Sequence, residues 1–144
     1  MDPNQTLDYS LEGAKWLGLG IGVGYSTLIF VGPLTSSVLS KKIESQEELD
    51  SIVVEESKRL GLEGVKGIYT DELVASMSYI SKDGIPMVRV NNFFGCRRAV
   101  RHELYHLYKG HCKKKFQSKL SAKLYYFLIG EPQACLYQLT GIKL

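Results

Sequence analysis

Two histidines four residues apart, His102 and His106, enclose a glutamate at position 103. This H-E-x-x-H pattern favours a helix, because one helical turn brings side chains at positions i and i+4 to the same face. On that face two imidazoles can share one metal ion, and Glu103 can reach a water molecule bound to it. The pattern therefore predicts a metal-site helix of the kind that zinc-dependent hydrolases use.

A catalytic zinc site of this type needs a third protein ligand and an open position for water. Glu131 is the only acidic residue after Glu103. A helix–loop–helix return of this length can bring Glu131 back to the motif helix, so we predict it as the third ligand. His111 and Cys112 remain alternatives, since Cys112 holds the place of the third histidine in the extended H-E-x-x-H-x-x-G-x-x-H motif.

The composition suits one modest domain with a single core. The chain has 144 residues, of which 44% are hydrophobic. Its 3 cysteines are an odd number without C-x-x-C spacing. This supports neither a disulfide framework nor a structural zinc knuckle, and it favours a reducing compartment.

The first part of the chain, residues 1–44, is set apart by an apolar segment at residues 16–34, predicted here as an N-terminal helix. Its length is about the minimum for a helix that crosses a bilayer, and its regularly spaced glycines suit close helix contacts in lipid. Glycine alternating with apolar residues also fits a buried hairpin or strand, so both interpretations stay open. In a spanning helix, Lys41 and Lys42 would leave the remaining chain in the cytoplasm.

Residues 45–144 are predicted as a separate α+β domain. A capping box at residues 45–48 begins a helix that Gly61 ends. Three strands are expected to form a small antiparallel sheet, and Pro86 suggests that its strand is short or lies at an edge. The expected strands cover residues 65–70, 73–80 and 85–90. The later helices are expected over residues 97–109, 118–129 and 132–140.

Three stretches, residues 85–92, 97–106 and 131–134, resemble the ImmA/IrrE-type metallopeptidases. That family combines a strand ending near Asn, an H-E-L-x-H helix and a later E-x-E-A-[ND] segment. The resemblance covers residues 45–144, and the late motif is also similar to that of the HtpX-type membrane metallopeptidases. It implies a minimal gluzincin in which His102, His106 and Glu131 hold zinc.

The late motif departs from the family pattern at two positions. Gln133 stands where a second glutamate is usual, and Cys135 stands where Asp or Asn is usual. An Asp or Asn there can hydrogen-bond a zinc-bound histidine, and losing such a partner can cost about 10–100-fold in metal affinity or activity.

We therefore predict a zinc-dependent peptidase in which Glu103 is the general base that accepts a proton from water. Manganese or iron would also accept the same ligands. The resemblance implies a regulatory enzyme of narrow specificity, and the predicted substrate is a protein or peptide. The candidate donors to the oxyanion are Tyr105, Tyr125, Tyr126 and Tyr137.

The lysines at residues 113–115 form a basic loop with three interpretations. It is a solvated loop, a contact to anionic lipid headgroups, or a contact to an acidic protein substrate. No recognition helix or aromatic–basic platform accompanies it, so nucleic acid is not an expected partner. The competing class of function is a non-catalytic metal-binding interaction module, associated with a membrane through residues 16–34.

Overall fold

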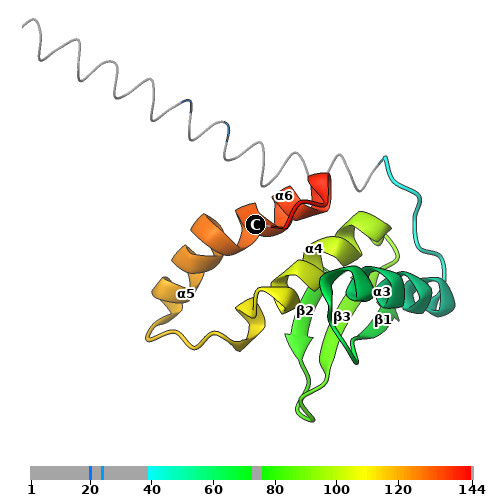
Figure 1. The fold of residues 1–144 in the computed structure, drawn as a ribbon, viewed down its shortest axis with the longest axis horizontal. Helices are drawn as coiled ribbons and strands as arrows, with labels where there is room; N and C mark the ends of the chain where they lie inside the picture. The colour runs from blue at the N-terminus through cyan, green and yellow to red at the C-terminus, as the bar shows by residue number, and fades with distance from the viewer. Residues whose placement is uncertain (1–19, 21–23, 25–38, 73–75, 144) are drawn as a thin grey trace, which may run out of the picture.

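The computed structural model describes residues 39–72 and 76–143, together with Gly20 and Gly24. Over this part the chain has the predicted α+β class, with a three-stranded sheet and several helices (Figure 1). In chain order the elements are α3 (Gln46–Leu60), β1 (Lys66–Thr70), β2 (Met77–Ile80), β3 (Pro86–Asn91), α4 (Arg97–Tyr108), the 3-10 turn η2 (His111–Lys113), α5 (Lys119–Tyr125), the π-helical turn η3 (Tyr126–Gly130) and α6 (Glu131–Thr140).

The apolar segment at residues 16–34 lies outside the described residues, apart from Gly20 and Gly24. Whether it forms a membrane helix therefore stays a prediction, as does the boundary between residues 1–44 and 45–144. Among the described residues, no helix combines the length and the apolar character that crossing a bilayer requires.

Helix α3 begins and ends as the sequence predicts. The Ser45 side chain accepts a hydrogen bond from the Glu48 backbone N–H at 3.2 Å, which satisfies one of the free donors of the first turn. Gly61 ends the helix with φ of 73°, a left-handed conformation that glycine adopts without a steric penalty. Leu49, Val53 and Leu60 face the core.

The sheet differs from the predicted antiparallel arrangement. The strand order is β1-β3-β2, so β3 takes the central position. β2 pairs with β3 antiparallel, with Ser78 opposite Val88, whereas β1 pairs with β3 in parallel, with Tyr69 opposite Val90. The chain reverses direction between β1 and β2 and again between β2 and β3, so β1 and β3 run the same way. Because β3 lies between the other two strands, it pairs with β1 in parallel.

Of the two interpretations of Pro86, a strand at the edge is wrong, because its strand is the central one. Pro86 is the first residue of β3, a position where proline's missing N–H interrupts no inner bond of the ladder. The centre suits this strand because Val88 and Val90 are fully buried. β2 begins at Met77, and residues 73–75 of the longer predicted strand lie outside the described part.

The turn between β3 and α4 fixes where the motif helix starts. The buried Asn91 side-chain oxygen accepts hydrogen bonds from the backbone N–H groups of Phe93 at 3.0 Å and Phe94 at 2.7 Å. A Cβ atom at Gly95 would lie 2.2 Å from the Asn91 carbonyl oxygen, so only glycine fits there. Helix α4 then begins at Arg97, as the sequence predicts.

Helix α4 lies between the sheet and α6 (Figure 1). Its predicted apolar stripe is buried, with Val100 and Leu104 facing the core. Tyr105 stacks on Tyr137 of α6 with ring centroids 4.9 Å apart and planes 24° apart, and both rings are buried. Such a pair adds about 0.5–1.5 kcal/mol beyond its buried area.

The last helices form one run instead of the two separate helices predicted. The backbone stays helical from α5 through η3 into α6, and the Glu131 N–H bonds to the Tyr126 carbonyl five residues back. Pro132 has no N–H to donate, so an ordinary α-helical turn would lose a bond there. The chain takes a wider π turn just before Pro132, a form of local bulge that often accompanies functional sites.

A buried carboxylate joins α3 to α4. Glu56 is fully buried, and its two oxygens form ion pairs with Arg97 at 2.5 Å and Arg101 at 3.0 Å. Burial alone would raise the pKa of Glu56, but the guanidinium groups of Arg101 and Arg97 outweigh it and hold the pKa below its ordinary value. The ionised form of Glu56 therefore stabilises the folded chain.

This pairing predicts a pH-dependent stability. Because the pKa of Glu56 is lower in the folded chain than in the unfolded one, its contribution is present above the unfolded pKa and lost as pH falls through the folded value. Glu56→Gln should lower the free energy of unfolding at pH 7 by about 1–3 kcal/mol and have a smaller effect at pH 3. Urea unfolding at both pH values measures this, with Glu63→Gln in the exposed loop after α3 as the control. An equal loss at both pH values would contradict the assignment.

Candidate metal centre

The donor atoms of the three predicted ligands lie close together. His102 Nε2 lies 3.2 Å from His106 Nε2 and 3.2 Å from one Glu131 carboxylate oxygen, and the other oxygen lies 3.5 Å from His106 Nε2. Ligands at the usual zinc distances of about 2.0–2.1 Å stand about 3.3 Å apart at the corners of a tetrahedron. The three side chains therefore have the spacing that a tetrahedral cation requires.

Two elements supply these side chains. His102 and His106 come from successive turns of α4, and both imidazoles are largely shielded from solvent. Glu131 is the first residue of α6 and comes directly after the π turn η3. Because α6 packs along α4, this carboxylate faces the two imidazoles from the opposite side.

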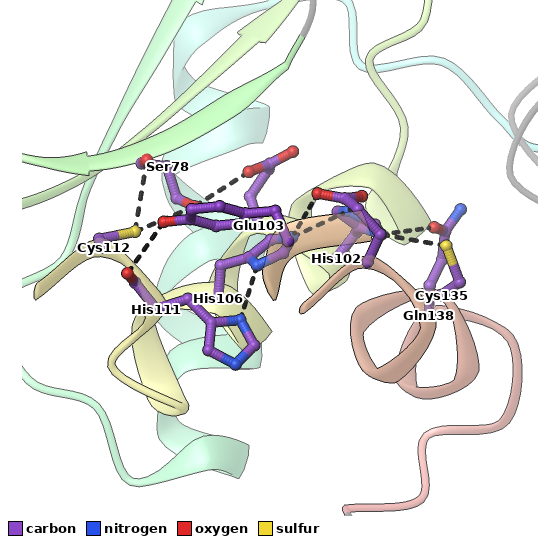
Figure 2. A network of polar contacts seen from close by, with 10 residues as sticks. Ser78, His102, Glu103, His106, His111, Cys112, Cys135 and Gln138 are labelled. Carbon is purple, nitrogen blue, oxygen red and sulfur yellow. Dashed lines mark hydrogen bonds and ion pairs between the residues drawn. The ribbon is translucent and has the colours of Figure 1, made fainter. Parts of the chain in front are cut away.

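Gln138 is a residue of the candidate site that the sequence did not single out. His102 Nδ1 lies 3.1 Å from the Gln138 side-chain oxygen, which can only accept, so Nδ1 carries the proton (Figure 2). That hydrogen bond leaves Nε2 free to bind a metal, as outer partners of metal-bound histidines usually do. Gln138 lies two helical turns after Glu131, on the same face of α6, and this spacing was the signal available in the sequence.

Cys135 also approaches the outer nitrogen of His102, but less closely than Gln138 does. Its sulfur lies 4.0 Å from His102 Nδ1, farther than the Gln138 oxygen. A second candidate trio, His102, Glu131 and Cys135, has ligand atoms within 4.8 Å of one another. The donor atoms of His102, His106 and Glu131 lie closer together, at 3.2–3.5 Å. Because Gln138 already accepts a hydrogen bond from the His102 nitrogen that Cys135 approaches, we favour His106 as the ligand.

His111 contacts the outer nitrogen of His106 and not the point where the ligands converge. The two Nδ1 atoms lie 2.9 Å apart (Figure 2). If His106 offers Nε2 to a metal, its Nδ1 must carry a proton, and His111 must accept it. Burial, assisted by Lys114 and Lys109, lowers the pKa of His111, so the ring stays uncharged and can accept.

The π turn holds His111 in place. The Tyr126 hydroxyl donates to the His111 carbonyl oxygen at 2.9 Å. A Cβ atom at Gly130 would lie 3.2 Å from the Tyr126 ring and 3.5 Å from His111 Nδ1, so the turn packs closely against both side chains. Cys112, the other alternative ligand, points at the backbone oxygen of Ser78 at 3.4 Å.

Glu103 lies beside the ligands but faces β2. Its carboxylate accepts a hydrogen bond from the Ser78 hydroxyl at 3.0 Å (Figure 2). Burial raises the pKa of Glu103, against the opposing effects of His102 and Ser78. A carboxylate with a raised pKa that is not itself a ligand is suited to accept and return a proton near neutral pH.

An open cleft of about 460 Å³ gives access to these groups. Residues 76–78 beside and within β2 line it together with His102, Glu103, His106 and Glu131. Of the four tyrosines proposed as oxyanion donors, Tyr126 lines the cleft. Tyr105 and Tyr137 are buried in the core, and Tyr125 packs against Phe116 and Lys114.

The two inner imidazoles differ strongly in proton affinity. Burial disfavours charge on His102, but contacts with Cys135, Glu131 and Glu103 raise its pKa to about 10. Burial and the neighbouring charge of His102 lower the pKa of His106 to about 4. The metal-free cluster thus carries its proton on His102, and a bound cation would take that proton's place.

Comparisons with models of protein families, with curated proteins and with solved structures found no match to this chain.

The contact between Gln138 and His102 predicts that this glutamine, and not Cys135, supports the metal. Gln138→Leu removes the acceptor from His102 Nδ1 and should lower zinc affinity by about 10–100-fold. Cys135→Ser is the matched control on the same helix and should change the affinity little. Competition with a zinc chelator measures both variants. The assignment fails if Cys135→Ser loses as much affinity as Gln138→Leu.

A second pair of variants tests the role of His111. His111→Leu removes the acceptor beside His106 Nδ1 and should also lower zinc affinity by about 10–100-fold, whereas His111→Asn keeps an acceptor oxygen near the same place and should retain most of it. The same chelator competition measures the affinity, and thermal unfolding of the metal-free chains checks the fold. Equal losses in both variants would mean that His111 acts only through packing.

Proposed function

We propose that the chain is a zinc-dependent peptidase. The observation that carries this proposal is the close grouping of the His102, His106 and Glu131 donor atoms, with spacings that suit one cation, at a cleft that also contains Glu103. The donor set of two imidazoles and one carboxylate is the set that several zinc hydrolases use, with one position left for water. The sequence resemblance to the ImmA/IrrE-type metallopeptidases agrees with this function.

The chemistry divides between the metal and the chain. Bound zinc would supply an acidified water and a positive charge for the substrate carbonyl oxygen. Glu103 accepts the proton of the attacking water and delivers it to the departing nitrogen, so the proton count balances over the reaction. Ser78 holds the Glu103 carboxylate from the β2 side at 3.0 Å. Tyr126 is placed to contact the substrate in the cleft.

A peptide is the substrate that the cleft favours. β2 lies at the edge of the three-stranded sheet, and Met77 and Ser78 of that strand line the cleft. Within the described part of the chain, β2 has its one strand neighbour on the inner side. An extended peptide can add to such an edge through main-chain hydrogen bonds, a common mode of peptide recognition.

Two substitutions separate catalysis from metal binding. Glu131→Ala removes a ligand and should abolish stoichiometric zinc in the purified chain. Glu103→Gln should keep zinc and lower peptide hydrolysis by about 10²–10⁴-fold, because the amide cannot accept the proton. Elemental analysis gives the zinc content, and mass spectrometry of a digested peptide library gives the turnover.

Glu63→Gln, in an exposed loop away from the cleft, is the matched control and should keep both zinc and turnover. Undiminished hydrolysis by Glu103→Gln would eliminate the proposed mechanism. Zinc bound by the wild-type chain without any hydrolysis would instead support the competing function, a metal-binding interaction module.

A further inference from the structure

We propose that α5 and η3 form a docking surface for an anionic lipid bilayer. The surface consists of an apolar stripe, Leu120, Leu124 and Leu128, flanked by exposed lysines, and we call it the leucine–lysine face. This proposal needs neither metal nor hydrolysis, so it stands apart from the proposed peptidase function. The basic loop at residues 113–115 becomes one part of this larger surface.

The apolar stripe is exposed in the described structure. None of the residues of α5 is buried. Leu120, Leu124 and Leu128 are 66%, 50% and 57% exposed, and their four-residue spacing places them along one side of the helical run. Large aliphatic side chains repeated on one helix face normally mark a contact surface, because soluble chains bury such faces.

The charge next to the stripe has a single sign. From residue 104 to residue 130 the sequence contains six lysines and no acidic residue. Five of them are exposed around the stripe: Lys113, Lys114, Lys115, Lys119 and Lys123. Lys114 lies over the Tyr125 ring, with its nitrogen 3.9 Å from the ring centroid, which holds one ammonium group beside α5.

The combination selects one kind of partner. A helix face with leucines and flanking lysines matches an anionic membrane surface, where the apolar side chains enter the acyl boundary and the ammonium groups meet lipid phosphates. A protein groove would need an acidic rim that fits this lysine pattern in shape as well as in charge. The bilayer needs only the charge complementarity that the leucine–lysine face already has.

The test places a fluorescent reporter on the face itself, so that residues 16–34 cannot produce the signal. The full chain carries Trp16→Phe, which removes its only tryptophan, and then Leu124→Trp on α5. The matched control is Val54→Trp on α3, at a position 67% exposed. Each chain is mixed with vesicles of brominated phosphatidylcholine, with or without phosphatidylserine, because bromine quenches tryptophan only at the acyl boundary.

We expect quenching of the reporter at position 124 in the phosphatidylserine vesicles, several-fold less in neutral vesicles, and none at position 54. Replacing Lys113, Lys114 and Lys115 together by Gln should weaken vesicle binding at low salt by about 100-fold, as measured by the quenching. Leu120→Trp is a second reporter in case Leu124→Trp does not fold.

Three results would overturn the proposal. They are the absence of quenching at positions 120 and 124, equal quenching with neutral lipid, and self-association that shields these two reporters without vesicles. The last result would assign the leucine–lysine face to a second copy of the chain, and reporter shielding by an added protein alone would assign it to a protein partner.

Discussion

The packing of α6 along α4 is the interaction on which the site depends. The buried stack of Tyr105 on Tyr137 holds the two helices side by side, and the contacts that α6 makes in the candidate metal centre follow from that alignment. It sets Glu131 against the two imidazoles and Gln138 against the outer nitrogen of His102. A core contact without polar chemistry thus determines which polar atoms meet.

The sequence predicted the helix that carries the candidate metal site because its signal is local. The spacing of His102 and His106 needs only helical periodicity, and the capping serine before α3 acts within one turn. Glu131 was also predicted, because no other acidic residue follows Glu103. The α+β class followed from the same periodicities.

The features that were missed depend on how distant segments meet. The parallel pairing of β1 with β3 depends on which strand occupies the centre of the sheet. Pro86 suggested an edge strand, but at the first residue of β3 its missing N–H removes no inner hydrogen bond of the ladder. Gln138 approaches His102 because α6 packs along α4, and its spacing from Glu131 was a weak signal in the sequence. His111 was predicted as an alternative ligand, and only the fold around η2 and η3 turns it to the outer nitrogen of His106.

The π turn between α5 and α6 has a geometric consequence. A π turn contains one residue more than the α-helix it interrupts, and each residue of an α-helix advances the face by about 100°. Since α6 is fixed against α4, the length of η3 sets the direction in which the leucines of α5 point relative to Glu131. Deleting one residue from η3 would rotate those leucines around the helix axis while leaving the ligand atoms in place. The five residues of η3 therefore set the angle between the leucine–lysine face and the candidate ligand atoms.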